Sequence, residues 1–449
     1  MDTFFKFKER GTSLKTEILA GVVTFMTMAY IIFVNPGILS AAFGDAGAEW
    51  IPALATATAL GAALMCLAMG LIANRPLALA SGMGLNAVVA FSIILGAGVP
   101  WQVGMSVVFV EGIIILLLVM TGLREAIMDA IPINLKRAIG VGIGLFITFI
   151  GLVDGGLVTA NPATLVQLGD FANPAVWVTL IGLVAIFAFM ALKVKGDILW
   201  GILVAAVAAL IFGVTELPKE IVATPDFSTF FAPFQQVDGK IALLHVFTPT
   251  LLLFVFALML TDFFDTMGTV LSVGEQAGFV DKDGKVPGIR NILAVDSVAA
   301  AVGGLFGASS ITTYVESAAG VAEGGRTGLT SVVTGLLFAL TVFFTPVIAM
   351  IGGSTSITAG ALIVVGFLMM TNIKEIPWTD FENAFPAFLV IVGIPLTYNI
   401  SYGIGLGFIS FVLIKLLNKK AGEIHWLMYI TSVLFVLAFI LPSIQAAIG

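Results

Sequence analysis

Apolar stretches of about 20 residues follow one another along almost the whole chain. An α-helix of roughly that length crosses the hydrocarbon core of a bilayer. The mean hydropathy is +1.12 and charged residues make up 10% of the sequence, whereas soluble domains carry about 25% charged residues. The sequence therefore predicts an all-α polytopic membrane protein.

The apolar stretches predict fourteen transmembrane segments. They cover residues 17–36, 52–73, 78–95, 101–121, 136–153, 175–192, 197–214, 246–275, 289–306, 311–323, 327–351, 356–371, 382–397 and 399–418. With the N-terminus in the cytoplasm, all 20 Lys and Arg residues except Lys219 and Lys240 fall on the inner side, as the positive-inside rule requires. We expect a multi-pass protein of the plasma membrane, the inner membrane in a bacterium. The apolar segment 425–444 is expected either to span the membrane or to lie at its surface.

The longest polar stretch, 215–245, divides the predicted spans into seven and seven. An odd number of spans in each half requires the halves to be inverted relative to each other, an arrangement common among transporters. The expected units are a first repeat at 1–214, an extracellular connection at 215–245, a second repeat at 246–424 and a C-terminal apolar segment at 425–449.

The third and tenth spans are short and rich in small residues, and each carries a polar side chain at its centre, Asn86 or Glu316. Each begins with a short run, 77–80 or 311–314, that we interpret as extended backbone leading into a half-helix. Non-helical backbone at this depth is tolerated only where it is buried in protein or lines a cavity. Paired interruptions of this kind indicate a binding site.

Two acidic residues lie where a membrane protein tolerates them least. Asp265 lies inside a long apolar run, and Glu316 lies in the interrupted tenth span. A carboxylate at mid-bilayer costs roughly 2.5–3.5 kcal/mol on insertion scales. The functional interpretation is that both acids face a substrate. The structural alternatives are a helix-packing acid for Asp265 and a half-helix cap for Glu316.

Other polar residues have weaker claims to a direct role. Asp262 lies one helical turn before Asp265, and Glu111 stands alone in an apolar helix, so we expect both to support the site. Glu111 is expected to bond the broken element of the first half from behind. Asp296 is interpreted as a solvated or capping residue. Glu323 and Arg326 are expected to pair near the cytoplasmic end.

Several classes of function are excluded by what the sequence lacks. One cysteine and two histidines form no metal cluster of familiar spacing, and no phosphate-binding loop for ATP is present. The charges are scattered through short loops rather than gathered into a basic patch. We therefore expect no cofactor, no direct use of ATP and no nucleic-acid partner.

Three segments together carry a family resemblance: GMGLNA at 82–87, TDFFDTMGT at 261–269 and TTYVESAAG at 312–320. They resemble the hypoxanthine/guanine/adenine permease branch of the nucleobase–ascorbate transporter superfamily. The similarity extends from GTSLKTEILAG near the start to PLTYNISYGIG near the end. It implies two inverted seven-span repeats that form a core domain, here about 17–121 and 246–351, and a gate domain, about 136–214 and 356–418.

The resemblance also implies a site and a mechanism. In the family an acid on the eighth span and an acid or amide on the tenth hold a purine, and these positions match Asp265 and Glu316. The third-span asparagine matches Asn86. The expected substrate-binding residues are Asp265, Glu316, Asn86, Thr313 and Phe264, with Asp262 and Glu111 as supporting residues. Family members are proton symporters, so the two acids are also expected to carry the coupled proton in an elevator-like import mechanism. Tyr402 stands where a smaller or more acidic residue is expected.

The chemistry of purines favours oxopurines modestly. Guanine and hypoxanthine present N–H donors that a carboxylate accepts as charge-assisted bonds, whereas adenine needs a protonated acid or an amide opposite its N1. Alternatives remain open: a uracil or xanthine permease of a sister branch, or an anion transporter on the same fold, which would want a cation where Glu316 stands. An enzyme is not expected. The expected partners are a purine nucleobase, protons and the lipid bilayer, with a homodimer left open.

Overall fold

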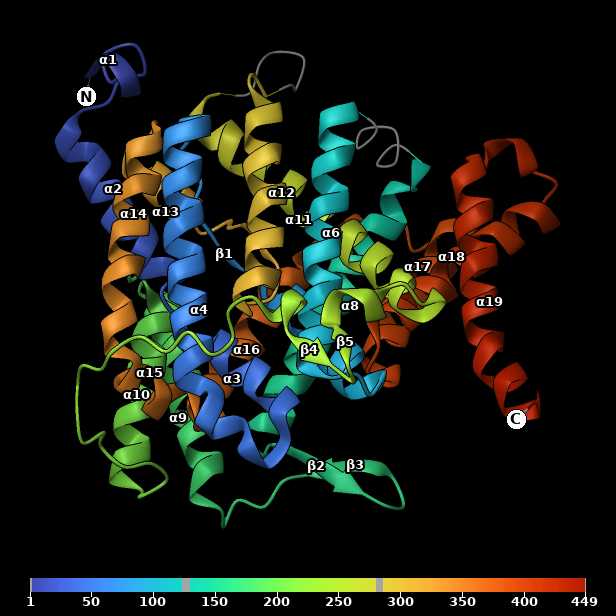
Figure 1. The fold of residues 1–449 in the computed structure, drawn as a ribbon, viewed down its shortest axis with the longest axis horizontal. Helices are drawn as coiled ribbons and strands as arrows, with labels where there is room; N and C mark the ends of the chain where they lie inside the picture. The colour runs from blue at the N-terminus through green and yellow to red at the C-terminus, as the bar shows by residue number, and fades with distance from the viewer. Residues whose placement is uncertain (1, 123–129, 280–285, 449) are drawn as a thin grey trace.

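The computed structural model describes residues 2–122, 130–279 and 286–448. Among these residues, ten helices are long and apolar enough to cross a membrane. Four shorter apolar helices accompany them: Met83–Gly96, Asp197–Ile211, Phe381–Thr397 and Trp426–Leu437. The protein is therefore a mostly helical, polytopic membrane protein (Figure 1).

The helices of the first half are α1 (Asp2–Phe5), α2 (Leu14–Met28), α3 (Ile31–Ser40), α4 (Gly47–Ala68), α5 (Met83–Ala87), α6 (Trp101–Thr121), α8 (Ile133–Asp154), α9 (Pro174–Ala191) and α10 (Asp197–Ile211). Other helical segments extend some of them: η1 (Ala41–Ala46) is a 3₁₀-helix, and η2 (Met69–Ala73) and η3 (Val88–Gly96) are π-helical. Side chains cap several N-termini. Ser13, for example, accepts the backbone N–H of Thr16 at the start of α2, which satisfies one of the free donors there.

The helices of the second half are α11 (Pro249–Ala277), α12 (Ile289–Phe306), α13 (Ser317–Ala322), α14 (Gly328–Thr341), α15 (Thr345–Gly352), α16 (Thr355–Met369), α17 (Phe381–Thr397), α18 (Ile400–Leu417) and α19 (Trp426–Ile448). Short turns accompany them: η4 (Ala232–Phe234), η5 (Ala242–Val246), η6 (Val342–Phe344), η7 (Met370–Glu375) and η8 (Ala421–Glu423). The segment predicted at 425–444 is thus one helix, α19.

Two spans that were predicted to be continuous are interrupted in the structure. The span expected at 17–36 is α2 and α3 separated by a turn at Ala29–Tyr30, and the chain remains helical to Ser40. The span expected at 327–351 is α14 and α15, joined by the tight turn η6. Pro346 lies in the first turn of α15, where a missing N–H is tolerated and the ring favours a new helix start.

The helices pack in two sets of neighbours. In one set α6 lies along α12, and α2 and α4 lie against α14; in the other α8 packs on α16 and α17, α9 on α10 and α16, and α17 on α18. Glycines allow the closest contact. A Cβ on Gly112 of α6 would lie 2.3 Å from the backbone N of Ala301, and one on Gly304 of α12 would lie 2.5 Å from that of Phe109. Small residues are therefore required where α6 meets α12.

Within the described part of the chain, three two-stranded antiparallel sheets accompany the helices: β1 (Leu79–Ser81) with β6 (Ile311–Thr313), β2 (Val158–Asn161) with β3 (Leu165–Leu168), and β4 (Gln236–Val237) with β5 (Lys240–Ile241). The β2–β3 hairpin projects from the lower edge of the molecule in Figure 1. Neither it nor β4–β5 was predicted from the sequence, because both lie in polar connections where turn residues rather than apolar runs set the structure.

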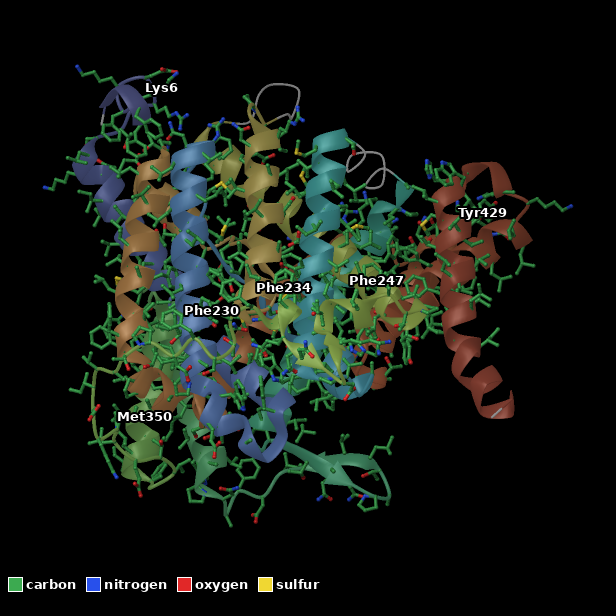
Figure 2. All side chains as sticks on the ribbon, in the orientation of Figure 1. Lys6, Phe230, Phe234, Phe247, Met350 and Tyr429 are labelled. Carbon is green, nitrogen blue, oxygen red and sulfur yellow. The ribbon has the colours of Figure 1, made fainter. Side chains whose placement is uncertain are left out.

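The connection expected at 215–245 is bound to the helices it crosses. Phe230 stacks on Phe306 with 4.3 Å between ring centroids, and Phe234 contacts Phe109 edge-on at 5.8 Å. The N–H of Phe231 donates to the carbonyl of Leu305 at 2.6 Å. Figure 2 shows Phe230 and Phe234 in front of the helices. The connection therefore packs against α6 and the C-terminal end of α12.

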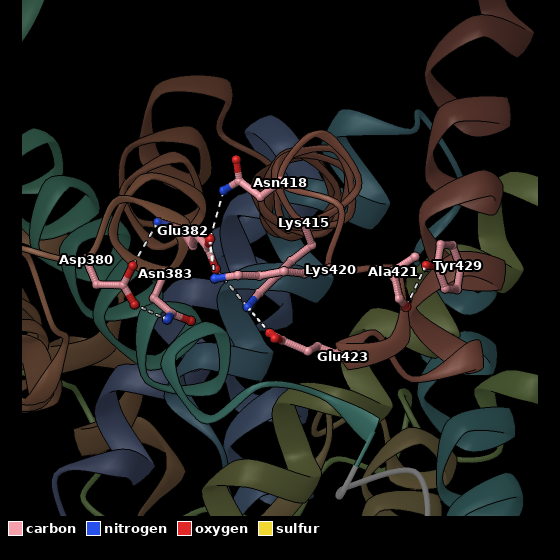
Figure 3. Close-up of polar contacts among 9 residues, drawn as sticks. All are labelled: Asp380, Glu382, Asn383, Lys415, Asn418, Lys420, Ala421, Glu423 and Tyr429. Carbon is pink, nitrogen blue, oxygen red and sulfur yellow. Dashed lines mark hydrogen bonds and ion pairs between the residues drawn. The ribbon is translucent and has the colours of Figure 1, made fainter.

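An ion-pair network attaches the turn before α19 to the ends of α17 and α18 (Figure 3). The ammonium of Lys415 lies 2.9 Å from the Glu382 carboxylate and 2.6 Å from that of Glu423, and Lys420 lies 2.7 Å from Glu382. Further along α19, Phe435 packs edge-on against Phe408 of α18. Polar pairs at one end and aromatic contacts along the helix thus fix α19 to α18.

Candidate functional site

Two short, buried strands from the two halves of the chain pair with each other, and we call this pair the strand crossing. β1 and β6 pair antiparallel, with Leu79 opposite Thr313 and Ser81 opposite Ile311, and they overlap the runs 77–80 and 311–314 expected to be extended. The pairing continues beyond the strands, because the N–H of Tyr314 donates to the carbonyl of Ala78 at 2.9 Å. Both strands are fully buried, and these bonds satisfy backbone groups that would otherwise lack partners.

Each strand leads directly into a helix. β1 is followed by α5, which continues as η3 to Gly96, and β6 is followed by α13. Because the strands are antiparallel, the two helices begin at opposite ends of the pair. Three paired residues at about 3.3 Å per residue separate those ends by roughly 10 Å. Asn86 and Glu316 therefore belong to helix starts on opposite sides of the crossing.

A buried carboxylate holds β6 in place. Asp296 of α12 is fully buried, and it accepts hydrogen bonds from the Thr266 hydroxyl at 2.7 Å and from the Thr313 backbone N–H at 3.2 Å. The Thr312 hydroxyl lies 3.4 Å from the same carboxylate. The interpretation of Asp296 as solvated or capping is therefore wrong. The sequence pattern of α12 looks amphipathic, but the Asp296 carboxylate points at β6 and α11 rather than at water.

Glu316 lies immediately before α13, and its carboxylate is bonded to a side chain from the first span. The hydroxyl of Tyr30 donates to Glu316 Oε1 at 2.6 Å. Tyr30 is 1% exposed, whereas Glu316 is half-buried and the preceding Val315 is 53% exposed. Glu316 therefore lies at the border between the buried interior and the exposed surface of the protein.

Asp265 belongs to α11 and lies on an open face of that helix. Asp265, Gly268, Ser272, Glu275 and Gln276 are exposed, although most residues between them are buried. Their spacing places them on one side of the helix, and a Cβ added to Gly268 would meet nothing within 4 Å. An exposed face made of polar and small residues is suited to water rather than to lipid. It runs from Asp265 to the C-terminal end of α11.

The acids of this region lie on elements that pack together. Helix α11, which carries Asp265, packs against β6 and α13, the two elements on either side of Glu316. The structure thus brings Asp265 and Glu316, the two acids singled out from the sequence, into one region. Among the described residues, no group of three or more His, Cys, Asp or Glu side chains could hold a metal ion.

The other predicted site residues occupy different surroundings. Asn86 is fully buried, and within the described chain neither atom of its amide has a hydrogen-bond partner; the same holds for the Thr313 hydroxyl. Asp262 and Glu111 are both fully buried, in α11 and α6. The side chain of Phe264 lies outside the described residues.

The sequence interpretation missed two members of this region. Tyr30 carries the hydroxyl that meets Glu316, and Asp296 anchors β6. A signal existed for Asp296, since a carboxylate inside an apolar helix is costly wherever it lies. Tyr30 gave no such signal, because a single tyrosine in an apolar run is ordinary.

Glu323 and Arg326 do not pair in the way expected. Glu323 forms an ion pair with Lys195, in the turn before α10. The guanidinium of Arg326 donates to the carbonyls of Val321 and Gly325 instead. The turn after α13 is therefore connected to the α9–α10 turn by opposite charges.

A multi-pass helical membrane protein with paired interrupted elements and acids at their crossing belongs to the class of membrane transporters, not of enzymes. Comparison with known proteins gives the family. A family model described as the permease family matches residues 15–406. The chain belongs to that family and, within it, to the purine branch of the nucleobase–ascorbate transporters.

Several relatives match over nearly their full length, two bacterial permeases among them. The guanine/hypoxanthine permease PbuG of Bacillus subtilis is 43% identical over 445 residues, which cover 98% of this chain and 99% of PbuG. The adenine permease AdeQ of Escherichia coli is 38% identical over 441 residues, 98% of this chain and 96% of AdeQ. Among solved structures, the transmembrane domain of the cyanobacterial bicarbonate transporter BicA is similar with a TM-score of 0.64 at 16% identity, over 87% of this chain and 97% of that one. That likeness concerns the fold alone.

Proposed function

We propose that this protein is a secondary active transporter that imports purine nucleobases, with guanine and hypoxanthine favoured and adenine possible, by proton symport. The observation that carries the proposal is the pair of acids at the strand crossing: Asp265 on an open polar face and Glu316 at the border of the same region. The names of PbuG and AdeQ support a purine substrate.

Recognition would rest on complementary hydrogen bonding. The N–H groups of an oxopurine would donate to Asp265 and Glu316 as charge-assisted bonds, which are about twice as strong as neutral ones. Neither the N–H donor nor the oxygen acceptor of the buried Asn86 amide is bonded to another described residue. Both groups can therefore bond a purine edge that presents an acceptor and a donor. Thr313, whose hydroxyl is also buried without a partner there, would add a further contact, with Asp262 and Glu111 as supports.

Proton coupling would follow from the crowding of acids. Like charges in a site withdrawn from water disfavour each other's ionised form, so Asp265 or Glu316 would take up a proton on the outside and release it inside. The membrane potential adds about 2.3 kcal/mol per charge for each 100 mV. This term favours import of a neutral base together with a proton.

The architecture we propose has fourteen membrane segments in two inverted repeats, 1–214 and 246–424. The core would comprise about 17–121 and 246–351, and the gate about 136–214 and 356–418. The two sets of packed helices support this division, because α6, α12, α4 and α14 fall in the first group and α8, α16, α9 and α17 in the second. The core would move past the gate like an elevator. The N-terminus would lie in the cytoplasm and the protein in the plasma membrane.

The test is uptake of radiolabelled hypoxanthine by cells that lack their own purine permeases. We expect saturable uptake that unlabelled guanine and hypoxanthine inhibit best, that a protonophore abolishes and that removal of sodium leaves unchanged. Uptake that needs sodium would overturn the coupling. Stronger inhibition by uracil, xanthine or bicarbonate than by any of the three purines would overturn the substrate class.

A second substrate preference, for adenine, has one observation in its favour. The Asn86 amide can pair with the N1 acceptor and the amino donor of adenine, and AdeQ is 38% identical. The same competition assay decides between the two: a tenfold advantage of adenine over hypoxanthine would assign recognition to the Asn86 amide or to a protonated acid rather than to ionised acids.

A further inference from the structure

Tyr30 lies in the turn between α2 and α3, where the first membrane segment is interrupted. Its side chain is among the largest fully buried ones in the molecule. A buried phenol hydroxyl needs a hydrogen-bond partner. Here the partner is Glu316 Oε1, at 2.6 Å and 286 residues away in sequence.

The neighbouring contacts hold the Tyr30 phenol against the Glu316 side chain. A second bond joins the same segments, because the Thr27 hydroxyl reaches the backbone carbonyl of Glu316 at 3.5 Å, and α2 packs against α13. The other tyrosine nearby, Tyr314, donates its hydroxyl to the carbonyl of Ser81 instead. The phenol of Tyr30 is thus engaged by the Glu316 side chain, and that of Tyr314 by the backbone.

We propose that Tyr30 is a positioning residue for Glu316. Its hydroxyl fixes Oε1 and thereby the orientation of the carboxylate, which leaves Oε2 directed at an N–H donor of the substrate. The proposal rests on the proposed function and deepens it, because it assigns substrate recognition at Glu316 to one carboxylate oxygen. The favoured substrate class is then purines that present an N–H to that oxygen, such as hypoxanthine, over analogues methylated at the donor nitrogen.

A purely structural role for Tyr30 is the competing explanation. A structural hydroxyl would stabilise the turn between α2 and α3 whatever stands at position 316. A positioning hydroxyl acts only through the carboxylate, so its removal matters only while Glu316 is present. The two explanations therefore differ in how substitutions at the two positions combine.

The experiment measures hypoxanthine binding to the purified full-length protein in lipid nanodiscs, and uptake kinetics in cells. Tyr30→Phe keeps the ring and removes the donor. We expect the Kd and the KM for hypoxanthine to rise about tenfold to a hundredfold, the range for a lost hydrogen bond to a charged group, with the maximal rate nearly unchanged. Tyr429→Phe is the matched control: it also loses a hydroxyl bond, to the carbonyl of Ala421, and should bind like the wild type.

Combining the substitutions decides between the explanations. In the Glu316→Ala background, adding Tyr30→Phe should change hypoxanthine binding by less than about twofold, since nothing is left to position. Glu316→Asp withdraws the carboxylate by one methylene from Tyr30 and from the substrate, so it should weaken hypoxanthine binding at least as much as Tyr30→Phe does. Unchanged binding in Tyr30→Phe, or an equal loss with and without Glu316, overturns the positioning role.

The outcomes also separate this proposal from the one beneath it. A wild-type protein that binds and transports no purine refutes the proposed function itself. A wild type that transports purines beside a Tyr30→Phe variant with wild-type KM refutes only the role of Tyr30. If Tyr30→Phe does not reach the membrane, the Glu316→Asp measurement still decides, because a KM equal to that of the wild type would contradict a fixed carboxylate.

Discussion

The element that begins with β1 and the element that begins with β6 share one plan, a three-residue strand followed by a helix. Their central side chains meet different surroundings. Asn86 is fully buried, and its helix continues through the apolar turn η3 to Gly96. Glu316 is half-buried, receives the Tyr30 hydroxyl and precedes a helix of only 6 residues.

The difference follows from charge. A neutral amide is tolerated in a closed apolar region at a moderate desolvation penalty, whereas an isolated carboxylate is not. The element that carries the acid accordingly has a donor on Glu316 from α2–α3 and a clamp on β6 from Asp296 of α12. It also lies near the open face of α11. The two elements thus differ in exposure: the charged Glu316 is partly accessible to water, whereas the neutral Asn86 is fully buried. We call these two elements the charged half and the neutral half.

The largest effect is expected from removing charge at the crossing. Glu316→Gln and Asp265→Asn should each lower purine uptake at least about a hundredfold, because each removes a charge-assisted bond and a proton carrier together. Surface labelling or immunoblotting of membranes should show normal amounts of protein. A conservative change away from the site, Glu220→Gln in the exposed connection, serves as the control. Normal uptake kinetics in either variant, or loss of the protein from the membrane, would contradict direct roles for these acids.

The next effect concerns the Asp296 carboxylate, which is bonded to β6. Asp296→Ala should leave the Thr313 N–H without its acceptor and remove one of the two partners of the Thr266 hydroxyl, the other being Thr312 Oγ1 at 3.0 Å. This loss should destabilise the protein by roughly 1–3 kcal/mol. We expect a lower Tm in detergent and about tenfold weaker uptake, whereas Asp296→Asn, which retains an acceptor oxygen, should be milder. Equal Tm values for the wild type and Asp296→Ala would show that β6 holds its place without the carboxylate.

How much of this arrangement was accessible from the sequence depends on the kind of signal. The interrupted elements could be predicted, because glycine-rich breaks with a central Asn86 or Glu316 differ clearly from long apolar helices. Asp265 was also accessible, since the cost of a buried charge marks a position whatever the fold. The extent of the apolar runs likewise predicted a polytopic helical protein.

The contacts between distant segments were not accessible. The bond from Tyr30 to Glu316 joins residues 286 positions apart, and no local pattern encodes such a pairing. Asp296 was misjudged for the same reason, because its partners come from α11 and β6. The pairing of β1 with β6 itself depends on how the two halves assemble, which hydropathy does not determine.

A labelling experiment would sharpen the contrast between an open and a closed half. The native Cys66 is fully buried, so we expect it to react little and the labelling to come from the introduced cysteines. Gly268→Cys and Ser272→Cys on the exposed face of α11 should react with a charged, membrane-impermeant thiol reagent at least about tenfold faster than Asn86→Cys, because the reactive thiolate forms only where water reaches. Leu252→Cys, exposed on the apolar half of α11, should stay unreactive.

Two results of that experiment would count against the comparison. Equal labelling at positions 86 and 268 would show that both elements open to water together. Labelling at position 252 as fast as at 272 would show that exposure to the reagent does not follow the polar face. Protection of position 268 by added hypoxanthine would place the ligand on that face.

The smallest effect is expected at Asn86, and it tests whether the neutral half contacts the same ligand as the charged half. Asn86→Ala should weaken adenine inhibition of hypoxanthine uptake about threefold to tenfold more than guanine inhibition, because adenine depends on the amide for its N1 acceptor. Asn86→Asp should do more harm than Asn86→Ala above neutral pH, since a third acid near Asp265 and Glu316 adds repulsion when ionised. Its uptake should recover as the pH falls and the introduced carboxyl becomes protonated. Asn161→Ala, in the outer β2–β3 hairpin, is the control. An unchanged purine ranking together with an unchanged pH profile in both Asn86 variants would assign this residue to packing alone and leave recognition to the element that carries Glu316.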